Sequence, residues 1–114
     1  MNKYHSNIDG HLDIKVIEDT DEFDGKVETW QEILIHGNPD GLRSLARLLI
    51  QIADTNQNER SDIPNGAREH IHLRPKLDIS ESSNQVTIGR LDAKGTGEFY
   101  QTYIPKDTDK KNGL

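Results

Sequence analysis

Two histidines separated by one residue, His70 and His72, are the first candidates for chemistry in this sequence. On an extended strand, this spacing places both imidazoles on the same face. Imidazole and carboxylate groups are common zinc ligands, and His36 or Glu32 from a neighbouring strand could complete such a site. Arg74 continues the same row, and its positive charge disfavours a metal ion at this position.

The same two histidines could act as a general base, because imidazole titrates near neutral pH. The sequence offers no clear nucleophile to accompany them. It contains no cysteine, and no serine lies in a strand–turn–helix elbow. We therefore expect a binding protein without catalysis or cofactor. The alternative that stays open is a small metal- or anion-binding protein, or an enzyme, that uses His70 and His72.

The glycine-rich segment 89–97 is a second candidate. Glycines in a turn expose backbone N–H groups to an anion, and Lys94 would add a positive charge. The segment lacks the spacing of a P-loop, and no helix is expected after it. A hairpin turn that requires positive φ is the simpler interpretation.

A run of acidic residues beside the dipeptide Asp24-Gly25 is the third candidate. Asp-Gly favours a hairpin turn, because both residues tolerate positive φ. The run fails the pattern of a calcium loop, since the later ligand positions lack the required glycine and glutamate. Carboxylates on a hairpin instead suit docking to a basic partner. We expect the following residues to contact a partner: Asp19, Asp21, Glu22, Asp24, His70, His72 and Arg74.

The composition is that of a small, acidic, soluble protein. The chain has 114 residues and a formal net charge of -6, with 30% charged and 32% hydrophobic residues. These values predict a single domain over residues 1–114, with an ordered core at about 11–104 and flexible polar ends. The negative charge disfavours nucleic acid, and the short apolar runs disfavour a membrane. The absence of cysteine fits the cytoplasm, and unpaired sheet edges would allow a monomer or a homodimer.

Hydrophobic periodicity predicts the elements that position these residues. Alternation of polar and apolar residues predicts five strands. They lie at about 11–18, after the Asp24-Gly25 turn to His36, at 69–74, at 85–91 and at 98–104. Trp30 falls on the second strand, and it would mark an interface if it lies on the face away from the helix.

A single amphipathic helix is predicted to start at residues 38–41, where Asn38 can cap it and Pro39 suits the first turn. The residues predicted to form its buried stripe are Leu42, Leu45, Ala46, Leu49, Ile52 and Ala53. The order β-β-α-β-β-β predicts a two-layer α+β fold. We expect a mainly antiparallel sheet with the helix on one face.

Three blocks of the chain resemble one known family. They are IHGNPDGLRSLA at residues 35–46, REHIHLRP at 68–75 and GRLDAKGTGEF at 89–99. They resemble the predicted immunity-protein family thirty-two of bacterial polymorphic toxin systems, over about residues 30–100. The resemblance implies a protein that binds and neutralises a cognate toxin, without catalysis or cofactor. An acidic immunity protein suits a basic toxin such as a nuclease, because complementary charge speeds capture.

Overall fold

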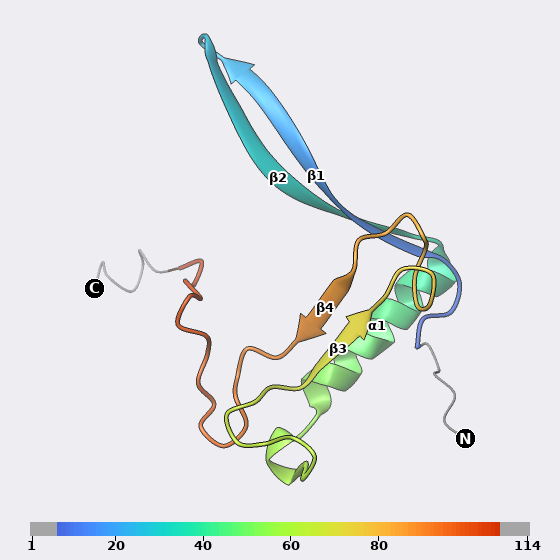
Figure 1. Ribbon diagram of the computed structural model, residues 1–114, viewed down its shortest axis with the longest axis vertical. Helices are drawn as coiled ribbons and strands as arrows, with labels where there is room; N and C mark the ends of the chain where they lie inside the picture. Colours follow the sequence, from blue (N-terminus) through green and yellow to red (C-terminus); the bar gives the residue numbers. More distant parts are fainter. Residues whose placement is uncertain (1–6, 108–114) are drawn as a thin grey trace.

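The computed structural model describes residues 7–107. The elements in chain order are β1 (Leu12–Phe23), β2 (Lys26–Gly37), α1 (Pro39–Asp54), the short 3-10 helix η1 (Gln57–Glu59), β3 (His70–Leu73) and β4 (Val86–Gly89) (Figure 1). The α+β class and the single amphipathic helix confirm the prediction. The polar ends that were predicted to be flexible lie largely outside the described residues.

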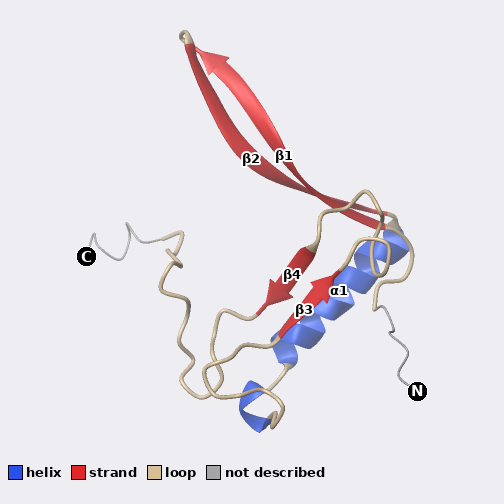
Figure 2. Cartoon of the chain, viewed as in Figure 1, coloured by secondary structure: helices blue, strands red, loops and turns tan. Residues whose placement is uncertain are grey.

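The strands form two separate antiparallel pairs instead of one sheet. β1 pairs with β2, and β3 pairs with β4 (Figure 2). The Asp24-Gly25 turn joins β1 to β2 as predicted, with φ of 54° at Asp24 and 75° at Gly25. β1 continues through the acidic run, so it is longer than the strand predicted at 11–18.

Residues 98–104, predicted as a fifth strand, contain no strand. Their aromatic side chains make ring contacts instead, one within the segment and one with the distant Arg68. The rings of Phe99 and Tyr103 are 5.5 Å apart, and the Arg68 guanidinium lies 3.9 Å from the centre of the Tyr100 ring. The Tyr103 N–H also donates to the Tyr100 carbonyl at 3.0 Å. The aromatic alternation therefore reflects turn and stacking contacts, which a period-two pattern does not distinguish from a strand.

α1 begins where the sequence predicts. The Asn38 side-chain oxygen accepts hydrogen bonds from the N–H groups of Gly41 and His11, both at 2.9 Å. Pro39 occupies the first turn, where its missing N–H has no intrahelical partner to lose. Gly41 is required, because a Cβ atom there would overlap the His11 backbone. The start of α1 is thus fixed directly against the segment that enters β1.

The buried face of α1 differs from the predicted stripe. Leu45 and Ile52 are buried as expected, but Leu42 and Leu49 remain 44% and 42% exposed. The members of the predicted stripe that are exposed are Leu42, Ala46, Leu49 and Ala53. Leu48, which lies outside the predicted stripe, is buried in the core instead.

The burial of the small residue Ser44 explains why a different side of α1 faces the core. Ser44 lies outside the predicted stripe, yet it is almost completely buried. Its hydroxyl accepts a hydrogen bond from the Asp9 N–H at 3.1 Å and lies 3.0 Å from the Gly41 carbonyl oxygen, to which it can donate. Small side chains on this side let the segment before β1 lie close to α1. The helix therefore turns this side inward and leaves half of its apolar arc uncovered.

The core lies between α1, the root of β1 and one face of the β3–β4 pair. Its buried members are Ile8, Leu12, Ile14, Leu45, Leu48, Ile52, Leu73 and Ile79. Ile71, Val86 and Ile88 are partly buried against it. The helix therefore covers one face of the β3–β4 pair, as predicted, and the other face is open.

The β1–β2 hairpin projects well beyond this core (Figure 1). The radius of gyration is 18.1 Å, compared with about 13 Å for a compact chain of this length. We call residues 18–32 the arm, because every one of them is exposed, and we call the remaining described residues the body. Within the described residues, the structure contains no helix with the length and apolar character needed to cross a membrane.

Candidate interaction surface

The root of the hairpin is attached to the body by the loop between β3 and β4. The Ser83 hydroxyl accepts a hydrogen bond from the Ile14 N–H at 3.0 Å. The Asn84 side-chain oxygen accepts one from the Val16 N–H at 3.0 Å, and the Asn84 N–H donates to the Ile14 carbonyl at 2.7 Å. The loop thus satisfies backbone groups of β1 that a neighbouring strand would otherwise bind.

Asp13 adds a second attachment at the root. Its carboxylate accepts hydrogen bonds from the hydroxyls of Ser80 and Ser82. The Ser80 hydrogen bond, followed by that of Ser82, holds the pKa of Asp13 below its usual value. The charged carboxylate therefore keeps these bonds into moderately acidic solution, and the orientation of the hairpin is fixed at its base.

The arm carries the net charge of the whole chain. It contains one lysine and seven acidic residues, which are Glu18, Asp19, Asp21, Glu22, Asp24, Glu28 and Glu32. Its formal charge is thus -6, equal to that of the complete chain, which leaves 13 acidic and 13 basic residues elsewhere. The long-range field of the protein therefore originates mainly in the arm.

Trp30 lies in the part of the arm nearest the body and pairs with Asp19 across the hairpin. Cross-strand partners project to the same face, and Glu28 and Glu32 flank Trp30 on that face because strand side chains alternate. This face is opposite the one from which Ile14 enters the core. The indole is 44% exposed. An exposed aromatic framed by carboxylates suits a cationic side chain of a partner.

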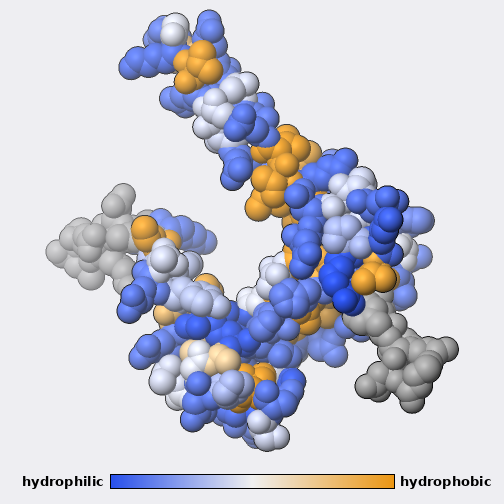
Figure 3. Space-filling view, in the orientation of Figure 1, coloured by the Kyte–Doolittle hydropathy of each residue, from blue (hydrophilic) through white to orange (hydrophobic). Residues whose placement is uncertain are grey.

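The opposite face of the hairpin is apolar near its root. Ile35 pairs with Ile14 and Ile33 pairs with Val16. Ile14 is buried in the core, but Ile33 is 64% exposed, and Ile35 and Val16 are also exposed. Figure 3 shows apolar side chains gathered on the hairpin where it leaves the body. The apolar surface of the core thus continues outward without cover, as at a protein interface.

His70 and His72 lie on the β3 face that is turned away from α1. Their rings are in edge-to-face contact, with centroids 5.1 Å apart. The Nδ1 atom of His70 is 2.9 Å from the Arg68 carbonyl oxygen, and that of His72 is 3.0 Å from the Thr87 hydroxyl. Each ring is therefore oriented by one hydrogen bond. Among the described residues, no group of three or more potential metal ligands comes together.

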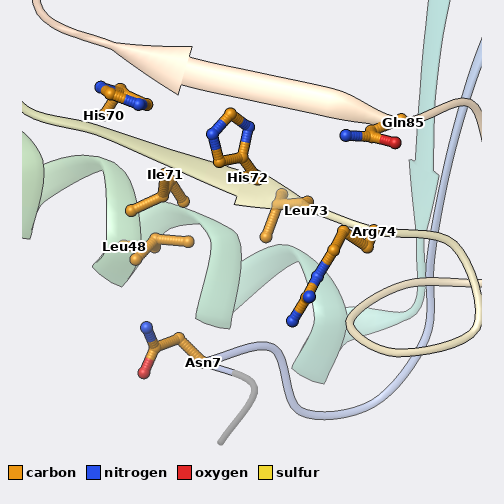
Figure 4. A pocket seen from close by; sticks show the side chains of 8 residues that line it. All are labelled: Asn7, Leu48, His70, Ile71, His72, Leu73, Arg74 and Gln85. Carbon is orange, nitrogen blue, oxygen red and sulfur yellow. The ribbon is translucent and has the colours of Figure 1, made fainter. Parts of the chain in front are cut away.

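Arg74 does not continue the row of histidines, because β3 ends at Leu73. In Figure 4, its side chain extends toward Asn7 and away from the two imidazoles. The Arg74 N–H donates to the buried Asp78 carboxylate at 2.7 Å, and its Nε atom lies 3.5 Å from the same oxygen. Arg74 and Asp78 thus stabilise the turn after β3. A groove of about 580 Å³ runs along this part of β3.

The two cations of segment 89–97, Arg90 and Lys94, also bind polar groups of the body. The Lys94 ammonium donates to the carbonyls of Arg60 and Ile63. The Arg90 guanidinium donates to backbone carbonyls at the C-terminal end of α1 and pairs with the Asp92 carboxylate. These contacts hold loops and the helix end together, so this segment has a structural role.

The polar loop after α1 is likewise held to the body by ion pairs and hydrogen bonds. Arg60 pairs with Asp62 at 2.7 Å and with Glu69 at 3.1 Å. The hydrogen bond from Arg60 lowers the pKa of Asp62 to about 2. The side chain of Gln57 is buried and binds the Glu69 N–H at 2.6 Å. The loop therefore packs as part of the body.

The structure brings together four of the seven residues predicted to contact a partner. These four are Asp19, Asp21, Glu22 and Asp24, and all are exposed on the arm. His70, His72 and Arg74 lie on the body instead. The sequence prediction did not include Glu28. Its position two residues from Trp30 on a strand is the signal that places it on the same face.

These features define a small α+β protein that presents a long, acidic and partly apolar hairpin to its surroundings. A family model described as Immunity protein 32 matches residues 32–91, which is more than half of the chain. The chain belongs to this family of immunity proteins. The matched range runs from the last part of β2 past β4 and leaves most of the arm outside it. No curated protein and no solved structure matches the chain.

Proposed function

We propose that this protein binds and neutralises a cognate protein toxin without catalysis, and that the arm is the surface that captures the toxin. Membership of the immunity-protein family supports the general role. One observation carries the choice of surface: the net charge of the entire chain coincides with an exposed tryptophan on a projecting hairpin. Asp19, Asp21, Glu22 and Asp24 are the principal charged contacts in this proposal.

The chemistry of the arm favours a basic toxin. Proteins that act on nucleic acid carry Lys and Arg at the surfaces that contact phosphates. A nuclease in the cytoplasm would present such a surface. An arm with a formal charge of -6 would be drawn to it, and once bound it would occupy the place of the substrate backbone. The same charge disfavours contact between the arms of two copies.

The open face of the β3–β4 pair provides a secondary contact in this proposal. A toxin held against the arm and large enough to reach the body would meet the exposed His70 and His72. Arg74 is left out of the contact surface, because it closes the turn after β3.

The test uses the product of the gene adjacent to that of this chain, which in this proposal encodes the toxin. Co-expression measures protection from growth arrest, and stopped-flow mixing of the purified proteins measures the association rate against salt. The arm variant neutralises four acids: Asp19→Asn, Asp21→Asn, Glu22→Gln and Asp24→Asn. The control removes the same charge from exposed positions on the body: Asp54→Asn, Glu59→Gln, Glu98→Gln and Asp107→Asn.

At low salt, we expect the arm variant to associate about tenfold more slowly or worse, because steering by a charged surface accelerates encounter by roughly 10 to 1,000 times. The body variant should change the rate by less than about threefold, within the same argument. The difference should shrink as salt screens the field. Equal slowing by both variants would exclude the arm as the capture surface, and no complex with the wild type would remove the proposed function.

A further inference from the structure

The outer edge of β1 is blocked along much of its length. At the root, side chains of the β3–β4 loop bind its backbone groups, as described above. Further out, the Thr20 N–H donates to the Asp19 carboxylate at 3.0 Å, and the Glu22 N–H donates to the Asp21 carboxylate at 2.9 Å. These bonds occupy donors that an added strand would need. The edge of β1 is thus protected against strand pairing.

Within residues 7–107, the outer edge of β2 has no such protection. Ile14 directs its N–H and C=O away from β2, so the pair Ile14–Ile35 is not hydrogen-bonded, and the Ile35 groups also point outward. Every second residue of β2 shares this orientation. The outward groups belong to Val27, Thr29, Gln31, Ile33 and Ile35. Among the described residues, neither a third strand nor a side chain binds these groups.

We infer that the outer edge of β2 accepts a strand of the partner, in which basic residues alternate with aliphatic ones. This inference rests on the proposed function and specifies how the toxin binds. Side chains of an added strand alternate between the two faces of the hairpin. On one face they would lie beside Glu28 and Glu32, which favour Lys or Arg. On the other face they would lie beside Ile33 and Ile35, which favour aliphatic groups.

One physical argument favours a third strand of any kind, and a second favours a basic strand over a second copy of this chain. An isolated two-stranded hairpin is marginally stable in water, so a long one benefits from a third strand. A second copy would bring its own arm, with a formal charge of -6, against an arm of the same charge. Strand pairing between like-charged arms is unfavourable, whereas a strand carrying Lys or Arg gains charge pairing in addition to backbone hydrogen bonds.

The first test uses a nine-residue synthetic peptide of alternating Lys and Val, and a control peptide of the same composition in which the two residue types are clustered. Binding is followed by the fluorescence of Trp30, the only tryptophan of the chain. Amide hydrogen exchange measured by NMR then distinguishes the outward N–H groups of β2 from the inward ones. The alternating peptide should protect the outward amides of Val27, Thr29, Gln31 and Ile33. The inward amides of the intervening residues already bind β1 and should change less.

The second test blocks the edge without breaking the hairpin. Gln31→Pro removes an outward N–H and leaves the β1–β2 ladder intact, because proline is tolerated at the open side of an edge strand. Gln31→Thr is the matched control. We expect Gln31→Pro to weaken binding of both the peptide and the toxin at least tenfold, and Gln31→Thr to retain it. The Thr20–Thr29 cross-strand contact, measured by NMR, checks that the hairpin is still formed.

A third variant keeps the test decisive if proline disrupts the arm. Glu28→Lys combined with Glu32→Lys should reverse the preference, so that a peptide of alternating Glu and Val binds better than the Lys peptide. The inference is overturned by equal binding of the clustered peptide, by protection without alternation, or by edge protection in the free protein together with a dimer mass by light scattering. If the toxin binds the Gln31→Pro variant normally, strand addition is excluded and the proposed function is unaffected. If the wild type binds the alternating peptide but not the toxin, the proposed function fails and the edge remains a strand acceptor.

Discussion

The Ser83 hydroxyl lies against both backbone polar groups of Ile14. It accepts a hydrogen bond from the Ile14 N–H at 3.0 Å and lies 2.9 Å from the Ile14 carbonyl oxygen, to which it can donate. Both residues are buried. Beyond this point the hairpin leaves the body, so one side chain takes the place of a neighbouring strand at the root. The arm is thereby held in position without being covered.

Substitution of this serine should destabilise the root of the hairpin. Ser83→Ala leaves a buried N–H without its partner, and we expect the free energy of unfolding in urea to fall by about 1–3 kcal/mol. Exchange of the Ile14 amide should accelerate at the same time. Ser61→Ala, at an exposed position, is the control and should stay within about 0.5 kcal/mol of the wild type. Similar losses in both variants would contradict the role of the Ser83 hydroxyl.

Two neighbouring leucines of α1 test which side of the helix is buried. Leu48→Ala removes a core side chain and should lower the free energy of unfolding by about 2–5 kcal/mol. Leu49→Ala removes a side chain that is 42% exposed and should cost less than about 1 kcal/mol, because less apolar area leaves the core. Thermal and urea unfolding measure both. A larger loss of stability in Leu49→Ala than in Leu48→Ala would support the buried stripe predicted from the sequence.

Trp30 should contribute much of the toxin-binding energy. Truncation of a central aromatic at an interface typically costs about 2 kcal/mol or more, so Trp30→Ala should weaken the complex about 30-fold by calorimetry. The unfolding midpoint of the body should hardly change, because Trp30 lies outside the core. Phe23→Ala, near the tip of the arm, is the comparison and should have a smaller effect. Wild-type affinity in Trp30→Ala would place the contact elsewhere.

The ion pair between Arg90 and Asp92 predicts a pH-dependent contribution to stability. Hydrogen bonds from Arg90 lower the pKa of Asp92 below the usual 3.8. A depressed carboxyl pKa stabilises the folded state above the unfolded pKa, and this stabilisation is lost as the pH falls through the folded pKa. Asp92→Asn should therefore be less stable than the wild type at pH 7, and the difference should decrease toward pH 2. Urea unfolding at both pH values measures it, and a constant difference would exclude the ion pair as its cause.

Local chemistry made several features of the fold predictable from the sequence. Asn38 caps α1 through its own side chain, and the Asp24-Gly25 turn needs only residues that accept positive φ. The acidic set was also predictable, because four carboxylates close to one turn must lie on the same hairpin. Each of these features depends on residues that lie close together in the chain.

Other features depend on contacts between distant segments and could not be predicted. The apolar arc of α1 is wide enough to bury either half, and the choice is made by the chain segment at Asp9, which binds Ser44. The Tyr100 ring stacks on Arg68 instead of joining a sheet. The open edge of β2 is a property of the topology of the described residues, in which no other strand lies beside it.

The separation of charge between arm and body has a consequence for how the protein moves. The body contains 12 acidic and 10 basic residues, a formal charge of -2, whereas the much smaller arm has a formal charge of -6, so the molecule has a large permanent electric dipole. In the uneven field near a cationic surface, such a molecule experiences a torque as well as an attraction. The arm therefore rotates toward the surface before contact is made. On an anion-exchange resin it should adsorb in one orientation, by the hairpin, with the helix directed toward solvent.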